Sequence, residues 1–143
     1  MNKDLEQAKA LLENNEEYTC AACRAGESFA SEEHGVRPLM RWLNEGTDLS
    51  GASAADRIVG KAAAFLYVLL GVRTVYAPLM SVPARETLCA HGIEAIADAV
   101  VPAIRNRTDT GFCLMESAVW DISDPHEAKA ALERKISEMM AKK

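Results

Sequence analysis

The longest apolar stretch of the chain, residues 62–72, is followed directly by a segment that favours a β-strand, residues 73–80. A helix over the apolar stretch must be buried on nearly all sides. We predict that it begins at a capping pattern formed by Ser53 and Asp56 and ends at Gly71. A buried helix joined to a strand by so short a turn packs on a sheet.

The rest of the chain alternates helical and strand patterns in the same way. An amphipathic helix is predicted first, followed by a hairpin that turns at Gly26, because glycine takes the positive φ of a tight turn. Strand and helix alternating with short connections indicate an α/β protein: a three-layer α/β/α sandwich with a mixed, partly parallel sheet, and one domain over residues 1–143. The other predicted elements are helices at 3–14, 38–45, 82–91, 113–121 and 124–140 and strands at 18–23, 27–31 and 93–101. Pro38 is expected in the first turn of the second of these helices and Gly46 at its end, and Ser81 is expected to open the third, which stops at Gly92.

Composition and charge exclude several classes of function. The 143 residues carry a formal net charge of −5, and the basic residues are scattered, which does not favour a nucleic-acid partner. The N-terminus has no apolar signal region, and residues 62–72 are too few to cross a bilayer, so we expect neither secretion nor membrane insertion. Four cysteines in such a chain are expected to be reduced thiols, which indicates a cytoplasmic protein.

Two short stretches resemble the regions where cytidine deaminases carry their metal ligands. Residues 60–63 read Gly-Lys-Ala-Ala, where that family has a zinc ligand and a glutamate. Residues 83–87 read Pro-Ala-Arg-Glu-Thr, where the family has Pro-Cys-x-x-Cys. The resemblance therefore implies a cytidine-deaminase-like fold without the zinc ligands, so we expect no metal, no cofactor and no zinc-dependent deamination.

A closer resemblance is to a family of small proteins with the same fold, known only as a domain of unknown function. Residues 35–39, 55–64 and 106–116 carry it, and the middle segment is the most specific. The last segment has Leu114 where the family usually has proline. Membership implies the fold and not an activity, and the resembled fold commonly associates, so we expect a homo-oligomer.

Lys61 is the main candidate for binding a ligand. It is the only charge between Arg57 and Arg73, so its ammonium either reaches solvent or meets an anion. Residues 105–111 combine arginines, threonines and a glycine before a predicted helix, a composition suited to an anion, although ordinary loop polarity explains it equally well. We predict a pocket for a small nucleotide-like or other anionic ligand, lined by Gly60, Lys61, Ser81, Arg107, Thr108, Thr110 and Gly111.

Cys113 is the candidate nucleophile or redox thiol in an alternative, enzymatic interpretation. It lies near a predicted helix N-terminus, where the helix dipole lowers a thiol pKa, and Lys61 and Glu116 then serve as its charge partner and proton carrier. The simpler interpretation is that Cys113 is a buried apolar residue and Glu116 accepts hydrogen bonds from backbone amides. A third possibility is a subunit with only an assembly role. Cys20 and Cys23 are predicted to point to opposite faces of one strand, which excludes a shared metal.

Overall fold

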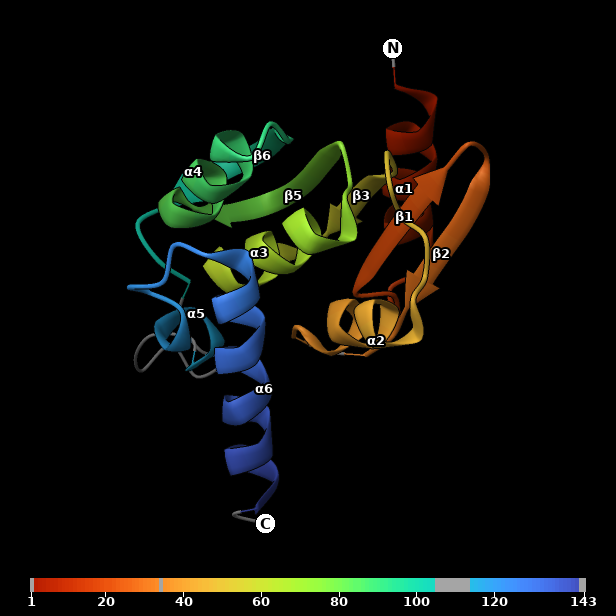
Figure 1. The fold of residues 1–143 in the computed structure, drawn as a ribbon. Helices are drawn as coiled ribbons and strands as arrows, with labels where there is room; N and C mark the ends of the chain where they lie inside the picture. Colours follow the sequence, from red (N-terminus) through yellow and green to blue (C-terminus); the bar gives the residue numbers. More distant parts are fainter. Residues whose placement is uncertain (1, 34, 105–113, 142–143) are drawn as a thin grey trace.

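The computed structural model describes residues 2–33, 35–104 and 114–141. These residues form a mixed six-stranded sheet flanked by helices (Figure 1). In chain order the elements are α1 (Lys3–Asn14), β1 (Cys20–Arg24), β2 (Glu27–Ser31), α2 (Arg37–Glu45), β3 (Ser53–Asp56), β4 (Ile58–Val59), α3 (Lys61–Leu70), β5 (Thr74–Ser81), α4 (Val82–Ala90), β6 (Glu94–Val101), α5 (Leu114–Ala118) and α6 (Pro125–Ala141).

The sheet is antiparallel at one end and parallel at the other. β1 pairs antiparallel with β2 and with β3, while β5 pairs parallel with β3, β4 and β6. β3 and β4 share one register along the same edge of β5, and Arg57, between them, falls opposite Pro78. The ladder between β5 and β6 is interrupted at the same proline. Because proline has no N–H to donate, Pro78 divides one long strand into β3 and β4.

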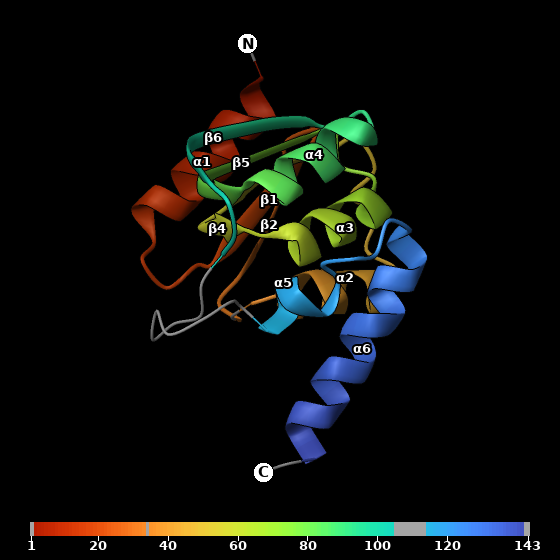
Figure 2. The same cartoon turned by 90° about the vertical axis from the view of Figure 1, so that its left-hand side faces the viewer.

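Helices cover both faces of the sheet. On one face α1 buries Leu5, Ala8 and Leu12 in a small core against β1, β3 and β5. On the other face α2, α3 and α4 pack over the sheet in the larger core, joined by the first half of α6. The two views in Figures 1 and 2 show α6 extending away from the sheet and from the other helices. The core is therefore centred on α3, whose side chains are buried almost all round.

Local signals account for most of the element boundaries. Pro38 lies in the first turn of α2, and Gly46 ends that helix in the left-handed conformation with φ 72°. The Ser81 hydroxyl caps α4 by accepting a hydrogen bond from Ala84 N–H at 3.1 Å. These three predictions, like the hairpin at Gly26, are confirmed.

The predicted start of the buried helix is wrong. Ser53 and Asp56 belong to β3 instead of capping a helix, and Gly60 is the N-cap residue of α3 instead of an interior helical residue. The capping pattern gave a wrong prediction because Ala54 and Ala55 have little strand preference of their own. Pairing with β1 and β5, which the local sequence does not encode, makes this segment a strand.

Among the helices that the structure describes, none combines the length and the hydropathy required to span a bilayer. Cys20 and Cys23 are both buried, and they pack on opposite faces of the sheet, as predicted.

The hairpin between β1 and β2 contains a strained residue that a substitution should relieve. Ala25 has φ 50°, a conformation that costs an L-residue roughly 1 kcal/mol and that asparagine tolerates better. Ala25→Asn is therefore expected to raise the free energy of unfolding by about 0.5 kcal/mol, measured by urea denaturation. The matched control is Ala10→Asn, on the exposed face of α1, which is expected to lower stability by roughly 0.5 kcal/mol. Equal effects at the two positions would contradict the strain argument.

Candidate ligand-binding site

The carboxyl ends of the parallel strands and the N-termini of two helices meet at one edge of the sheet. β4 runs through Gly60 into α3, and β5 runs directly into α4 at Ser81. Neighbouring parallel strands end at the same edge, which is where α/β proteins gather their ligands. Figure 2 shows α5 beside the N-terminal end of α3 at this edge.

The Glu116 side chain, from α5, joins these segments. Glu116 is 1% exposed, and its carboxylate accepts three hydrogen bonds from described residues. Oε2 accepts from the Lys61 backbone N–H at 2.6 Å and from the Ser81 hydroxyl at 2.6 Å, and Oε1 accepts from the Ile104 N–H at 2.7 Å. Since a buried carboxylate is stable only when its oxygens are bonded, this arrangement satisfies it and satisfies an orphan amide of α3 as well.

Gly60 makes room for this carboxylate. A Cβ at position 60 would lie 2.8 Å from Glu116 Oε2 and 3.1 Å from Cγ1 of Ile104, both closer than side chains normally approach. The φ of Gly60 is −99°, so the backbone conformation itself does not require glycine. The close approach of Glu116 is what requires it.

Beside Glu116 lies a cavity of about 800 Å³, large enough for a drug-sized molecule. Gly60, Ala62 and Ala63 at the start of α3 form one wall. Both alanines lie in the first turn of α3, and no described residue accepts a hydrogen bond from the N–H of Ala62 or of Ala63. The other lining residues are Glu16, Glu17, Tyr18, Thr19, Glu32, Gly35, Val36, Asp56, Arg57, Ile58, Ile104, Met115 and Glu116.

Asp56, at the end of β3, also lines the cavity. Its Oδ2 accepts a hydrogen bond from the buried Tyr67 hydroxyl at 2.7 Å, and its Oδ1 accepts one from Arg57 N–H at 2.8 Å. Burial disfavours the charged form of the carboxyl and raises its pKa from 3.8 to about 6, and the hydrogen bonds offset this only in part. A carboxyl group that titrates near neutral pH in a cavity is a candidate for binding or proton transfer.

The described charges around the cavity are mostly negative. Asp56, Glu116 and three glutamates, at positions 16, 17 and 32, contribute carboxylates, and Arg57 contributes the one guanidinium. The Arg57 guanidinium donates to the backbone carbonyls of Leu12, Asn15 and Tyr18 at 2.7–3.1 Å. Its hydrogen bonds therefore tie the end of α1 to the sheet.

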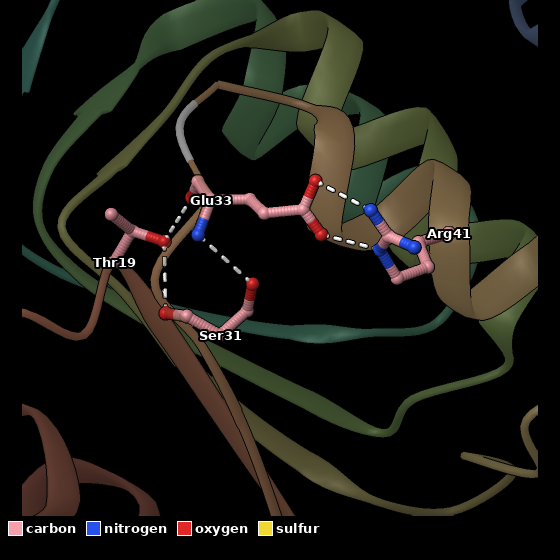
Figure 3. A network of polar contacts seen from close by, with 4 residues as sticks. All are labelled: Thr19, Ser31, Glu33 and Arg41. Carbon is pink, nitrogen blue, oxygen red and sulfur yellow. Dashed lines mark hydrogen bonds and ion pairs between the residues drawn. The ribbon is translucent and has the colours of Figure 1, made fainter.

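Thr19, which lines the cavity, also belongs to a network of polar contacts (Figure 3). The Thr19 hydroxyl donates to the backbone carbonyls of Ser31, at 3.1 Å, and of Glu33, and the Ser31 hydroxyl accepts from Glu33 N–H at 3.1 Å. The Glu33 carboxylate accepts hydrogen bonds from both Nε and Nη2 of Arg41, and these bonds lower the pKa of Glu33. Because Arg41 belongs to α2, the network links the hairpin to this helix.

The predicted site residues are only partly brought together. Gly60, Ser81 and Glu116 meet, and Lys61 joins them through its backbone N–H. The Lys61 ammonium instead donates to the Trp120 carbonyl at 2.5 Å and lies 5.7 Å from the centre of the Phe65 ring, beside a separate, smaller pocket between α3 and α4. The remaining predicted site residues, Arg107, Thr108, Thr110, Gly111 and Cys113, lie outside the described residues.

Within the part of the chain that the structure describes, no three His, Cys, Asp or Glu side chains are grouped to hold a metal ion. Asp56 was not among the predicted site residues, because the sequence pattern around it predicted a helix cap. The available signal was an acidic residue directly after a short buried segment, Ser53–Ala55, which is typical of the carboxyl end of a strand.

The fold and the site define a small mixed α/β domain with a ligand-sized cavity at the carboxyl edge of its sheet. Residues 7–136 match the family model TM1506, described as a domain of unknown function (DUF1893), so the chain belongs to this family. The prediction of a family of unknown function is confirmed. No curated protein matches the chain.

A solved structure has the same fold. It is a DUF1893 family protein, TM1506, from Thermotoga maritima, with a TM-score of 0.83 and 24% sequence identity. The alignment covers 94% of this chain and 92% of that one. At this identity the similarity shows the fold alone.

The contact between Gly60 and Glu116 predicts strong energetic coupling. Gly60→Ala is expected to lower the free energy of unfolding by about 1–3 kcal/mol, because the added methyl group displaces the buried carboxylate. In a Glu116→Ala background the same substitution should cost much less, giving a coupling energy of at least about 1 kcal/mol in a double-mutant cycle measured by chemical denaturation. Additive effects would show that position 60 is limited by Ile104 and not by Glu116.

Asp56 predicts a pH dependence of stability. Its pKa is higher in the folded protein, so its contribution to stability is fully present below pH 3.8 and is lost as the pH rises towards 6. Between pH 4 and 6 the free energy of unfolding of the wild type should therefore fall relative to that of Asp56→Asn. Asp48 is the control of opposite sign, because hydrogen bonds from Ser50 lower its pKa and its contribution is lost as the pH falls. Parallel pH profiles for wild type and Asp56→Asn would refute the assignment.

Proposed function

We propose that this protein binds a small nucleotide-like molecule in the cavity beside Glu116. The observation that carries the proposal is that one cavity is lined both by the Asp56 carboxyl and by Ala62 and Ala63, two first-turn residues of α3 whose N–H groups have no acceptor among the described residues. The resemblance to a cytidine-deaminase-like fold without zinc supports the same class of ligand. The cytoplasm is the proposed location.

The free N–H groups define one part of the ligand. They lie in the first turn of α3, where the helix dipole favours an oxygen that carries negative or partial negative charge. Glu116 already occupies the Lys61 N–H next to them. The ligand group that binds here is therefore a carbonyl or an anionic oxygen that lies next to the Glu116 carboxylate without displacing it.

The carboxylates define another part of the ligand. Asp56 and the glutamates that line the cavity accept hydrogen bonds and repel a ligand that is anionic throughout. A molecule that fits has N–H or O–H donors and, elsewhere, an acceptor. A nucleobase with its sugar has both, and a phosphate fits only where it lies away from the glutamates.

The predicted ligand residues take different parts in this proposal. Gly60 and Ser81 act through Glu116, which they accommodate and hold. Lys61 contributes its backbone to the site, while its ammonium is engaged by Trp120. A role for residues 107, 108, 110 and 111 in binding an anion remains a prediction, as does the alternative of an enzyme that uses Cys113.

A ligand screen tests the proposal. Purified protein is screened by thermal shift against nucleobases, nucleosides and nucleotides, and a ligand at 100 times its Kd is expected to add about 2.7 kcal/mol of apparent stability. Ala63→Leu, which fills the cavity beside the free amides, should abolish the shift. Ala130→Leu on α6, whose position does not line the cavity, is the matched control and should keep it.

Lys61→Met separates this proposal from the sequence-based hypothesis. If the ammonium contacts the ligand, binding weakens by roughly 1–3 kcal/mol, whereas the geometry predicts unchanged affinity. A ligand that still binds Ala63→Leu, or the absence of stabilisation by any member of the three compound classes, would overturn the proposal.

A further inference from the structure

Among the described residues, the outer edge of β6 has no strand partner. Of the described residues, only those of β5 pair with β6 in the sheet, and Figure 2 shows β6 at the margin of the sheet beside β5. The strand is eight residues long and contains no lysine, arginine or proline. Natural edge strands usually carry such residues, or are short, because a long open edge is a template for another strand.

We propose that the outer edge of β6 pairs antiparallel with β6 of a second copy of the chain, giving a dimer with one continuous sheet. A twofold axis perpendicular to the sheet relates two antiparallel copies of a strand, so the same row of backbone donors and acceptors serves both partners. A second copy therefore fits this edge without any further complementarity. The inference is independent of the proposed ligand.

Symmetry and charge select one register. Directly opposite residues share a face of the sheet, so under this twofold axis one residue of β6 must lie opposite its own copy. Asp98 on the axis would place two carboxylates together, and Ile96 on the axis would place Glu94 opposite the partner copy's Asp98. With Ala97 on the axis, Glu94 lies opposite Val100, Ala95 opposite Ala99 and Ile96 opposite Asp98. No acidic pair then lies directly opposite, and seven of the eight residues are paired.

The side chains of β6 suit this register. Ala95 and Ala97 pack on the larger core, on the face that α4 covers, and their small size allows the two copies to approach closely there. On the other face Ile96 packs against the core beneath α1, and Val100 is 36% exposed. The Asp98 carboxylate accepts a hydrogen bond from the Tyr76 hydroxyl at 2.6 Å, so it is held towards β5 and away from the new edge.

A charge-swap series tests the interface. The dimer dissociation constant is measured by analytical ultracentrifugation over a range of concentrations, with reducing agent present because Cys89 is exposed. Val100→Asp places a carboxylate opposite the partner copy's Glu94 at two symmetric positions and is expected to raise Kd about 2- to 30-fold. Val100→Lys is the matched control, which introduces the opposite charge and should lower Kd or leave it unchanged.

The double variant Val100→Asp, Glu94→Lys decides the register. It restores opposite charges only if these two positions face each other, so its Kd should return to the wild-type value or below. A wild-type chain that stays monomeric at every concentration would overturn the proposal. So would a dimer whose Kd is the same for Val100→Asp and Val100→Lys, since that dimer uses another surface.

Discussion

The buried carboxylate of Glu116 holds together the part of the molecule where ligand binding is proposed. It bonds to three segments that are distant in sequence: the start of α3, the junction of β5 with α4, and the chain after β6. A carboxylate buried to this degree is tolerated because each bond is donated by a group that otherwise lacks a partner or is itself a helix cap. Removing it would leave Lys61 N–H, Ile104 N–H and the Ser81 hydroxyl without their acceptor, so the three segments depend on it jointly.

Pro78 interrupts the sheet opposite Arg57, next to the Asp56 residue that lines the cavity. An uninterrupted strand over residues 53–59 would hold Asp56 and Arg57 in a regular ladder. The missing N–H of Pro78 interrupts that ladder, and at this point Arg57 bonds to carbonyls at the end of α1 while Asp56 turns to Tyr67. The Asp56 carboxyl thus lies beside the cavity at the end of β3, and burial raises its pKa.

The sequence predicted those parts of the fold that depend on local chemistry. Gly26, Pro38 and Ser81 each act within a few residues of themselves, through a turn, a first helical turn and a cap, and each was assigned correctly. The segment before α3 was assigned incorrectly, because its strand conformation comes from pairing with β5, some twenty residues further on. Glu116 was expected to accept from backbone amides, and it does, but the amides belong to Lys61 and Ile104, which no local pattern identifies.

The difference between local signals and contacts of distant residues also explains why the candidate site in the structure differs from the site predicted from the sequence. In the sequence Lys61 is the conspicuous feature, a lone charge in an apolar helix, and it suggests an anion. In the structure its position in the first turn of α3 lets the ammonium donate to the Trp120 carbonyl, while its backbone N–H donates to Glu116. A carboxylate of the chain itself therefore meets the positive potential at the helix start, while no described residue accepts a hydrogen bond from the amides of Ala62 and Ala63. Because carboxylates as well as residues of a helix N-terminus line the cavity, the proposed ligand must offer both hydrogen-bond donors and acceptors, and this requirement is stricter than attraction to charge alone.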